Sequence, residues 1–107
     1  MNLQQKNQLL GLYYSSLLPD IDILDDFKTK NNIENFDEII DEIKNIEISI
    51  YDYIWENTKP DKQLSASEIE EKFDSYCFEH YQWIDEAGLK SLKYCLMYMC
   101  WHEGVLK

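Results

Sequence analysis

Cys77 and His80 are the side chains best suited to nucleophilic chemistry, because they lie three residues apart in a segment with helical periodicity. Residues at this spacing share one helix face, so a thiol and an imidazole there could form a nucleophile and its base. His80, however, falls on the same apolar stripe as Phe73 and Ile84. Buried polar groups are usually hydrogen-bonded for structural reasons. We therefore expect a core histidine and predict that the protein is not an enzyme.

The candidate metal ligands are the cysteines and histidines, which are Cys77, His80, Cys95, Cys100 and His102. Their spacings, CxxH and CxxxxCxH, match no standard structural zinc site. The chain also lacks the Glu-x-x-His pairs of di-iron bundles and a glycine-rich phosphate loop. We therefore expect no metal and no cofactor, and three buried, reduced cysteines.

The net charge of the chain is −11, from 21 acidic residues and 10 basic ones, all of which are lysines. Residues 20–56 contain twelve of the acids and only three lysines. Phosphate backbones and anionic membranes repel such a chain, so we expect no direct binding to nucleic acid or to a membrane. Complementary fields speed encounter, so a basic protein is the favoured partner. Acidity that serves only solubility is the alternative.

Compartment and fold class follow from composition. An odd cysteine count with no CxxC does not indicate a secreted disulfide framework, and residues 1–20 form neither a good signal peptide nor a membrane span. We therefore expect a cytoplasmic protein. With 3 glycines, 2 prolines and a hydrophobic fraction of 45%, the 107 residues predict an all-α fold. We expect one compact domain, residues 1–107, built as a bundle of four to five helices.

Apolar periodicity and capping residues place the helices. Residues 3–18 form one expected helix, which ends at Pro19, and residues 20–30 form either a short helix or an ordered loop. The clearest pattern predicts a long helix over residues 36–57, with isoleucines at helical spacing. A capping box at Ser65 and Glu68 begins a helix that we expect to run to about residue 83. The last helix is expected to start after Asp85 and end near Gly104. Its second apolar stripe, Tyr94, Tyr98 and Trp101, predicts a central position in the bundle.

The long helix contains the candidate partner-binding residues. Opposite its isoleucine stripe, the helical angle groups four carboxylates with two apolar side chains: Asp37, Asp41, Ile48, Asp52, Trp55 and Glu56. Apolar residues ringed by acids are typical of a hot spot for a basic protein. The alternative is that a neighbouring helix covers Ile48 and Trp55. Tyr51 and Tyr53 flank this surface. Glu47 falls within the isoleucine stripe, where it either reaches outward or meets a Lys or Tyr.

In size, charge and helicity the chain resembles bacterial immunity proteins, which neutralise nuclease toxins; no family motif contributes to this resemblance. It implies an acidic, non-enzymatic inhibitor that blocks the active site of a basic nuclease toxin. One alternative is a helical assembly or adaptor module, or a homodimer, with no inhibitory role. Another is an enzyme that uses Cys77 and His80.

Overall fold

The computed structural model describes residues 2–56 and 63–106, and within them the chain forms five α-helices. Their bounds are α1 Leu3–Tyr13, α2 Ile21–Asn31, α3 Phe36–Glu56, α4 Ala66–His80 and α5 Glu86–His102. The prediction of an all-α bundle of four to five helices is confirmed. In this part of the chain, no helix is both long enough and apolar enough to cross a membrane.

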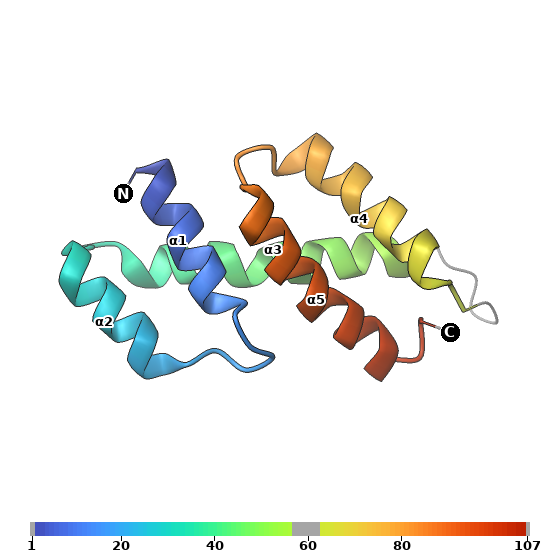
Figure 1. The fold of residues 1–107 in the computed structure, drawn as a ribbon, viewed down its shortest axis with the longest axis horizontal. Coiled ribbons are helices and arrows are strands. Elements are labelled where there is room, and N and C mark those ends of the chain that lie inside the picture. The colour runs from blue at the N-terminus through green and yellow to red at the C-terminus, as the bar shows by residue number, and fades with distance from the viewer. Residues whose placement is uncertain (1, 57–62, 107) are drawn as a thin grey trace.

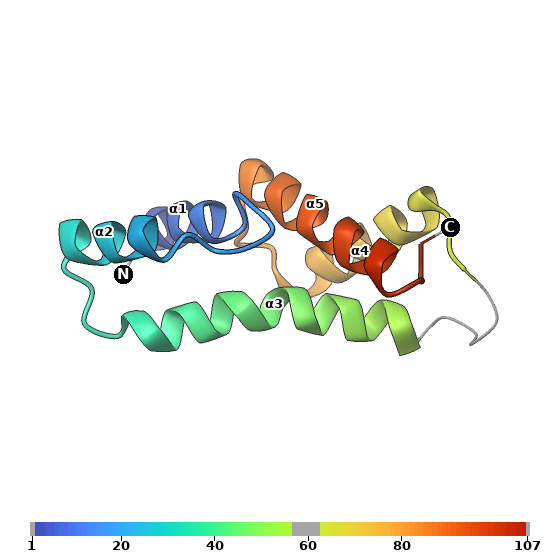
Figure 2. The ribbon, with the colours of Figure 1, turned by 90° about the horizontal axis from the view of Figure 1, so that it is seen from below.

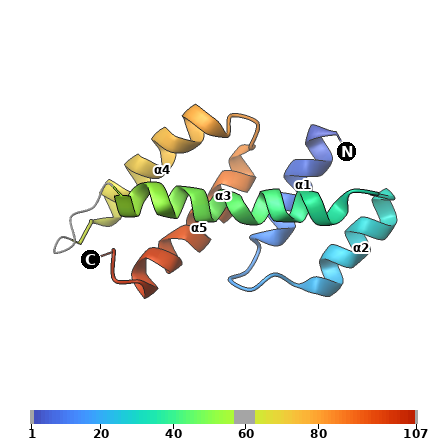
Figure 3. The ribbon, with the colours of Figure 1, turned by 180° about the vertical axis from the view of Figure 1, so that it is seen from behind.

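The helices form two layers of unequal size (Figures 1 and 2). α3 forms one layer alone and runs along the long axis of the molecule. The dimensions of the molecule are 47 × 25 × 20 Å. The other four helices lie on one side of α3, as the view in Figure 2 shows. Figure 3, seen from behind, has α3 in front of all of them. One long side of α3 therefore has none of the other four described helices over it.

The buried side of α3 is the isoleucine stripe that its sequence predicts. Its buried residues recur at spacings of three and four: Phe36, Ile39, Ile43, Ile46, Ile50 and Ile54. They join one core cluster with residues of the other four helices, including Leu10, Leu24, Phe73 and Leu96. Burying each such side chain contributes about 1.5–3 kcal/mol. This packing offsets the lower helix propensity of isoleucine, so α3 depends on the other layer for its stability.

α1 ends at Tyr13, so the expected helix over residues 3–18 was too long. The Ser15 hydroxyl donates to the carbonyl of Leu12, and the Ser16 hydroxyl donates to that of Leu18. Such local bonds compete with helical ones. The Tyr14 hydroxyl meanwhile donates to the carbonyl of Ile43, which fixes this end of α1 against α3. Pro19 therefore lies in a connecting segment and does not terminate the helix.

The remaining boundaries follow capping chemistry and one tertiary contact. Of the two alternatives for residues 20–30, the short helix is confirmed as α2, which the Asp20 side chain caps and Asn32, in the left-handed region with φ of 50°, ends. The capping box of Ser65 and Glu68 is confirmed. α4 ends at His80, before the expected residue 83, because Asn7 of α1 accepts from Asp85 N and donates to Trp83 O. The expected end of the long helix, residue 57, lies outside the described residues.

α5 ends as its Gly104 predicts. Gly104 has φ of +79°, and its N–H donates to the carbonyl of Trp101 at 3.2 Å. The N–H of Val105 donates to the carbonyl of Cys100 at 2.8 Å, which completes a Schellman motif. The chain then pairs Leu106 with Leu64 in an isolated parallel bridge. This bridge holds the segment that precedes α4 beside the end of α5.

Candidate protein-binding surface on α3

The six predicted partner-binding residues are all exposed on α3. Ile48 is 40% exposed and Trp55 is 53% exposed, although both are large apolar side chains. The alternative expectation, that a neighbouring helix covers them, is therefore wrong. The sequence predicted that these six residues share one side of the helix. That side is open because the other four helices all lie on the opposite side of α3 (Figure 3).

These residues extend along almost the whole of α3. At about 100° per residue, Asp37, Asp41, Ile48, Asp52 and Trp55 fall within an arc of about 60°. Glu56 lies about 40° further round, at the edge of the group. The rise of about 1.5 Å per residue separates the first and last of them by about 28 Å. We call these six residues the α3 surface; they form a narrow strip with acids at both ends.

Lys44 also lies on this side of α3, and the sequence expectation did not include it. It is exposed and stands one turn before Ile48 and three residues after Asp41. The negative charge is consequently divided into two groups, Asp37 with Asp41 and Asp52 with Glu56. Helical angle alone identifies this lysine, so it could have been found from the sequence.

The two flanking tyrosines leave α3 in different directions. Tyr51 stacks on Trp55, with ring centroids 6.4 Å apart and an angle of 16° between the planes. Burial and then the negative charge of Glu103 raise the pKa of Tyr51, as expected for a ring beside the end of α5. Tyr53 instead packs on Tyr76 of α4 at 4.9 Å. Only Tyr51 therefore extends the apolar part of the α3 surface.

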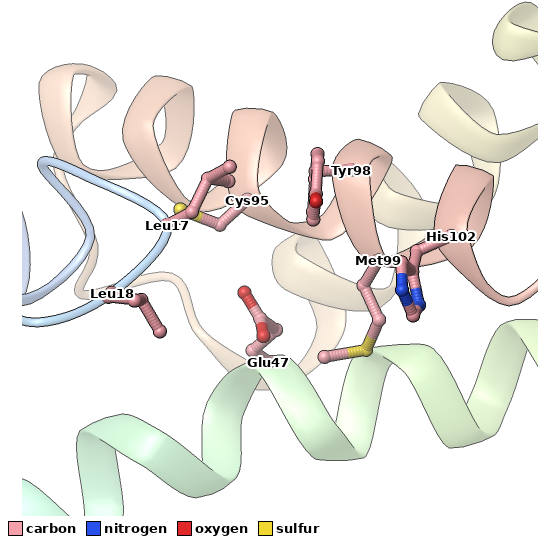
Figure 4. A pocket seen from close by; sticks show the side chains of 7 residues that line it. All are labelled: Leu17, Leu18, Glu47, Cys95, Tyr98, Met99 and His102. Atoms are coloured by element: carbon pink, nitrogen blue, oxygen red, sulfur yellow. The ribbon is translucent and has the colours of Figure 1, made fainter.

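Glu47 lines a pocket between α3, α5 and the segment that follows α1 (Figure 4). The pocket has a volume of about 430 Å³ and is otherwise lined by Leu17, Leu18, Cys95, Tyr98, Met99 and His102. Figure 4 shows the carboxylate rising from α3 into this space. The side chain is half-buried, and burial raises the pKa of Glu47. Glu47 also raises the pKa of the neighbouring Tyr14, after burial as the larger cause.

The expectation that His80 is a core residue was wrong. Its side chain is 49% exposed, packs on the Tyr76 ring at 4.4 Å and lies 3.8 Å from the Glu79 carboxylate. Cys77 is buried, and burial raises the pKa of its thiol to about 12. A thiol that holds its proton so firmly is a poor nucleophile. The shared helix face therefore does not create a nucleophile–base pair; that the protein is not an enzyme stays a prediction.

The other cysteines are also free and buried. Burial raises the pKa values of Cys95 and Cys100 to about 11, and the Cys95 thiol lies 3.5 Å from the carbonyl oxygen of Tyr14. Among the described residues, no three His, Cys, Asp or Glu side chains group together as metal ligands would. The expected lack of a metal or cofactor stays a prediction.

A second exposed apolar strip lies on α5, on the aromatic stripe from which the sequence predicted a central position for this helix. Tyr94 is 65% exposed, Tyr98 42% and Trp101 60%. α5 does contact α1, α3 and α4, which agrees with a central position. Its aromatic stripe is nevertheless largely exposed, although Tyr98 also lines the pocket that Glu47 of α3 borders. The two apolar stripes of α5 therefore indicated correctly that α5 packs against several helices. They did not indicate that both stripes are buried.

Comparison of the chain with protein-family models finds no match, and comparisons with curated proteins and with solved structures find none either.

Proposed function

We propose that the chain is an acidic, non-enzymatic protein that binds and neutralises a basic protein partner through the α3 surface. The observation that supports this most directly is the exposure of Trp55 and Ile48 on the long side of α3 that faces away from the other four described helices. On a helix side that only contacts water, a tryptophan and an isoleucine contribute no free energy of burial to folding. Between groups of carboxylates, these residues fit the apolar centre and charged rim of a binding site.

The electrostatics support a basic partner. Residues 20–56, which include α3, contain twelve acids and three lysines. Asp37, Asp41, Asp52 and Glu56 would face lysine or arginine side chains at the rim and would mainly accelerate association. Trp55 and Ile48 would lose their water on binding and would mainly slow dissociation.

The more specific proposal is an immunity protein that blocks the active site of a cognate nuclease toxin. Nucleases bind phosphate through basic grooves, so their substrate sites have the charge that the α3 surface complements. A narrow acidic strip about 28 Å long could lie along such a groove and exclude the nucleic acid. Inhibition would then be steric and electrostatic and would require no chemistry from the inhibitor.

Affinity capture with quantitative controls tests this function. The tagged wild-type chain, Trp55→Ala and Asp41→Asn/Asp52→Asn are each incubated with lysate of the native organism at low and high salt, and retained proteins are identified by mass spectrometry. The proposal predicts a basic protein that only the wild type retains well, and less firmly at high salt. That protein, once purified, should show nuclease activity that a stoichiometric amount of the wild-type chain suppresses. Equal retention by all three chains would refute the α3 surface as the binding site. Nuclease activity that the wild-type chain does not suppress would refute inhibition.

A helical assembly module or homodimer is the second candidate, and the exposed aromatic strip of α5 favours it. Tyr94, Tyr98 and Trp101 lie on successive turns, where a second copy could bury them symmetrically. Apolar self-association should persist at high salt, unlike binding to a basic partner. Sedimentation of the wild type and of Trp101→Ala over a range of concentrations and salt distinguishes the two functions.

A further inference from the structure

We propose that the pocket at Glu47 is a binding site for an organic cation, namely a primary ammonium group on a short alkyl stem. The pocket lies between α3 and α5, beside the segment of residues 14–20 that connects α1 to α2 (Figure 4). This inference does not depend on the proposed function, because it uses no residue of the α3 surface.

The walls of the pocket suit an alkyl stem. Leu17, Leu18 and Met99 supply aliphatic and thioether surface, and the Cys95 thiol adds a small apolar group. A volume of about 430 Å³ lies within the usual range for small-ligand sites, which is about 300–1,000 Å³. Such sites typically combine apolar walls with a few polar groups that orient the ligand.

Glu47 supplies the polar group and determines the sign of the ligand's charge. Its carboxylate is half-buried among apolar side chains, an environment that raises the pKa of Glu47 because the charged form loses water. Within residues 2–56 and 63–106, no lysine or histidine nitrogen forms an ion pair with it. A partly desolvated charge without a countercharge is stabilised by an added cation.

Tyr98 strengthens the preference of the pocket for a cation. Its ring lines the pocket from the α5 side, as Figure 4 shows, and aromatic faces attract ammonium ions. His102 lines the pocket as well and would compete with a cation if it were protonated.

Two sources carry this chemistry: a free alkylamine and the lysine side chain of another protein. The probe n-butylammonium reproduces the four-carbon stem and charge of lysine. A short peptide with one internal lysine presents the same group on a backbone. Saturable binding of n-butylammonium but not of the peptide would assign the pocket to free amines, and binding of both would extend it to lysine side chains. The two outcomes support the same site.

Methyl resonances of methionine provide the measurement, with an internal control in the same helix. Met99 lines the pocket, whereas Met97 does not. In chain labelled with ¹³C at the methionine methyl groups, n-butylammonium chloride should shift the Met99 signal saturably and leave Met97 almost unchanged. n-Butanol and butanoate have the same stem without the positive charge, so they should shift Met99 far less at equal concentration.

Glu47→Gln tests the carboxylate and keeps its size, with Glu38→Gln as the matched exposed control on α3. We expect the affinity for n-butylammonium to fall at least about tenfold in Glu47→Gln and to be unchanged in Glu38→Gln. Unchanged helical circular dichroism would show that both variants are folded. Lengthening the stem from ethyl to butyl should raise affinity in the wild type, independently of any variant. Equal shifts for butanol and butylammonium, equal affinity in Glu47→Gln, or no saturable shift of Met99 would each overturn the proposal.

Discussion

Tyr51 and Trp55 stack one turn apart on α3, with centroids 6.4 Å apart and planes inclined by only 16°. Tyr51 is half-buried at the end of α5, so its ring supports an indole that is itself 53% exposed. The indole thus gains a fixed neighbour while most of one side remains open to a partner. An aromatic side chain held in this way loses little conformational entropy on binding, which is a property of hot-spot residues.

Trp55→Ala should therefore weaken binding of the basic partner by about tenfold or more, mainly through faster dissociation. Folding stability should change by less than about 0.5 kcal/mol, because the side chain lies at the surface. Surface plasmon resonance gives both rate constants. Trp101→Ala on α5 is the matched control, since Trp101 is 60% exposed but lies off the α3 surface. A larger loss of affinity in Trp101→Ala would move the binding site to α5.

Neutralising two acids of the α3 surface should act on the association rate. We expect Asp41→Asn/Asp52→Asn to slow association about three- to tenfold at low salt, with little change in dissociation. Lys44→Gln, between the two acidic groups, should have the opposite effect and accelerate association. Stopped-flow measurements over a range of salt concentrations check both, because the differences should shrink as salt screens the charges. An unchanged association rate in both variants would contradict the acidic rim.

Glu47→Gln should stabilise the fold at neutral pH. The pKa of Glu47 is raised above 4.5 in the folded protein, so ionising it there costs free energy of folding. This cost is absent below the unfolded value of about 4.5 and reaches its full size once pH exceeds the folded value. The gain at about pH 7 should be at most about 1 kcal/mol, because water still reaches part of the carboxylate.

Thermal melts of the wild type and Glu47→Gln from about pH 3 to about pH 8 measure this difference. The titratable groups around Glu47 are Tyr13 and Tyr14 of the α1 end and Cys95, Cys100, Tyr98 and His102 of α5. The comparison is repeated in a His102→Gln background, which removes the imidazole that lines the pocket. A stability difference that does not depend on pH would show that the ionisation of Glu47 is not its cause.

The three cysteines should react slowly with iodoacetamide in the folded protein. Cys77, Cys95 and Cys100 are buried, and burial raises their pKa values to about 12, 11 and 11. Both effects lower the concentration of accessible thiolate. Mass spectrometry should find all three labelled in guanidinium chloride and none labelled over the same time without it. Rapid labelling of Cys77 in the folded protein would restore the hypothesis of an enzyme that uses this thiol.

An alanine at Gly88 tests the contact between α1 and α5, and an alanine at Gly11 is the control. A Cβ at Gly88 would lie 3.0 Å from both Ile84 Cγ2 and Leu10 Cδ2, so Gly88→Ala should destabilise the fold by about 1–3 kcal/mol. Gly11 is in α1, and a Cβ added there would meet no neighbouring atom within 4 Å, so Gly11→Ala should stabilise by about 0.5–1 kcal/mol. Urea unfolding of both variants measures the change in the free energy of unfolding, which should have opposite signs. Equal effects would mean that helix propensity alone governs both positions.

Periodicity and capping residues predicted much of the fold, because they act within one helix. The isoleucine spacing of α3, the capping box at Ser65 and Gly104 after α5 each specify local backbone geometry. The boundaries were wrong where a distant residue decides them. α1 stops early at the contact between Tyr14 and Ile43, and Asn7 binds the turn that follows α4.

The sequence by itself determined the helices, the buried stripe of α3 and the angular grouping of the acids with Ile48 and Trp55. These features depend on residue type and a period of 3.6 residues. Only the tertiary structure decided that α3 forms a layer alone, which exposes the α3 surface, and that His80 and the aromatic strip of α5 are exposed as well. It also decided that Glu47 borders a pocket. Helical angle tells which residues share a side, but whether another helix covers that side depends on contacts between residues far apart in the chain.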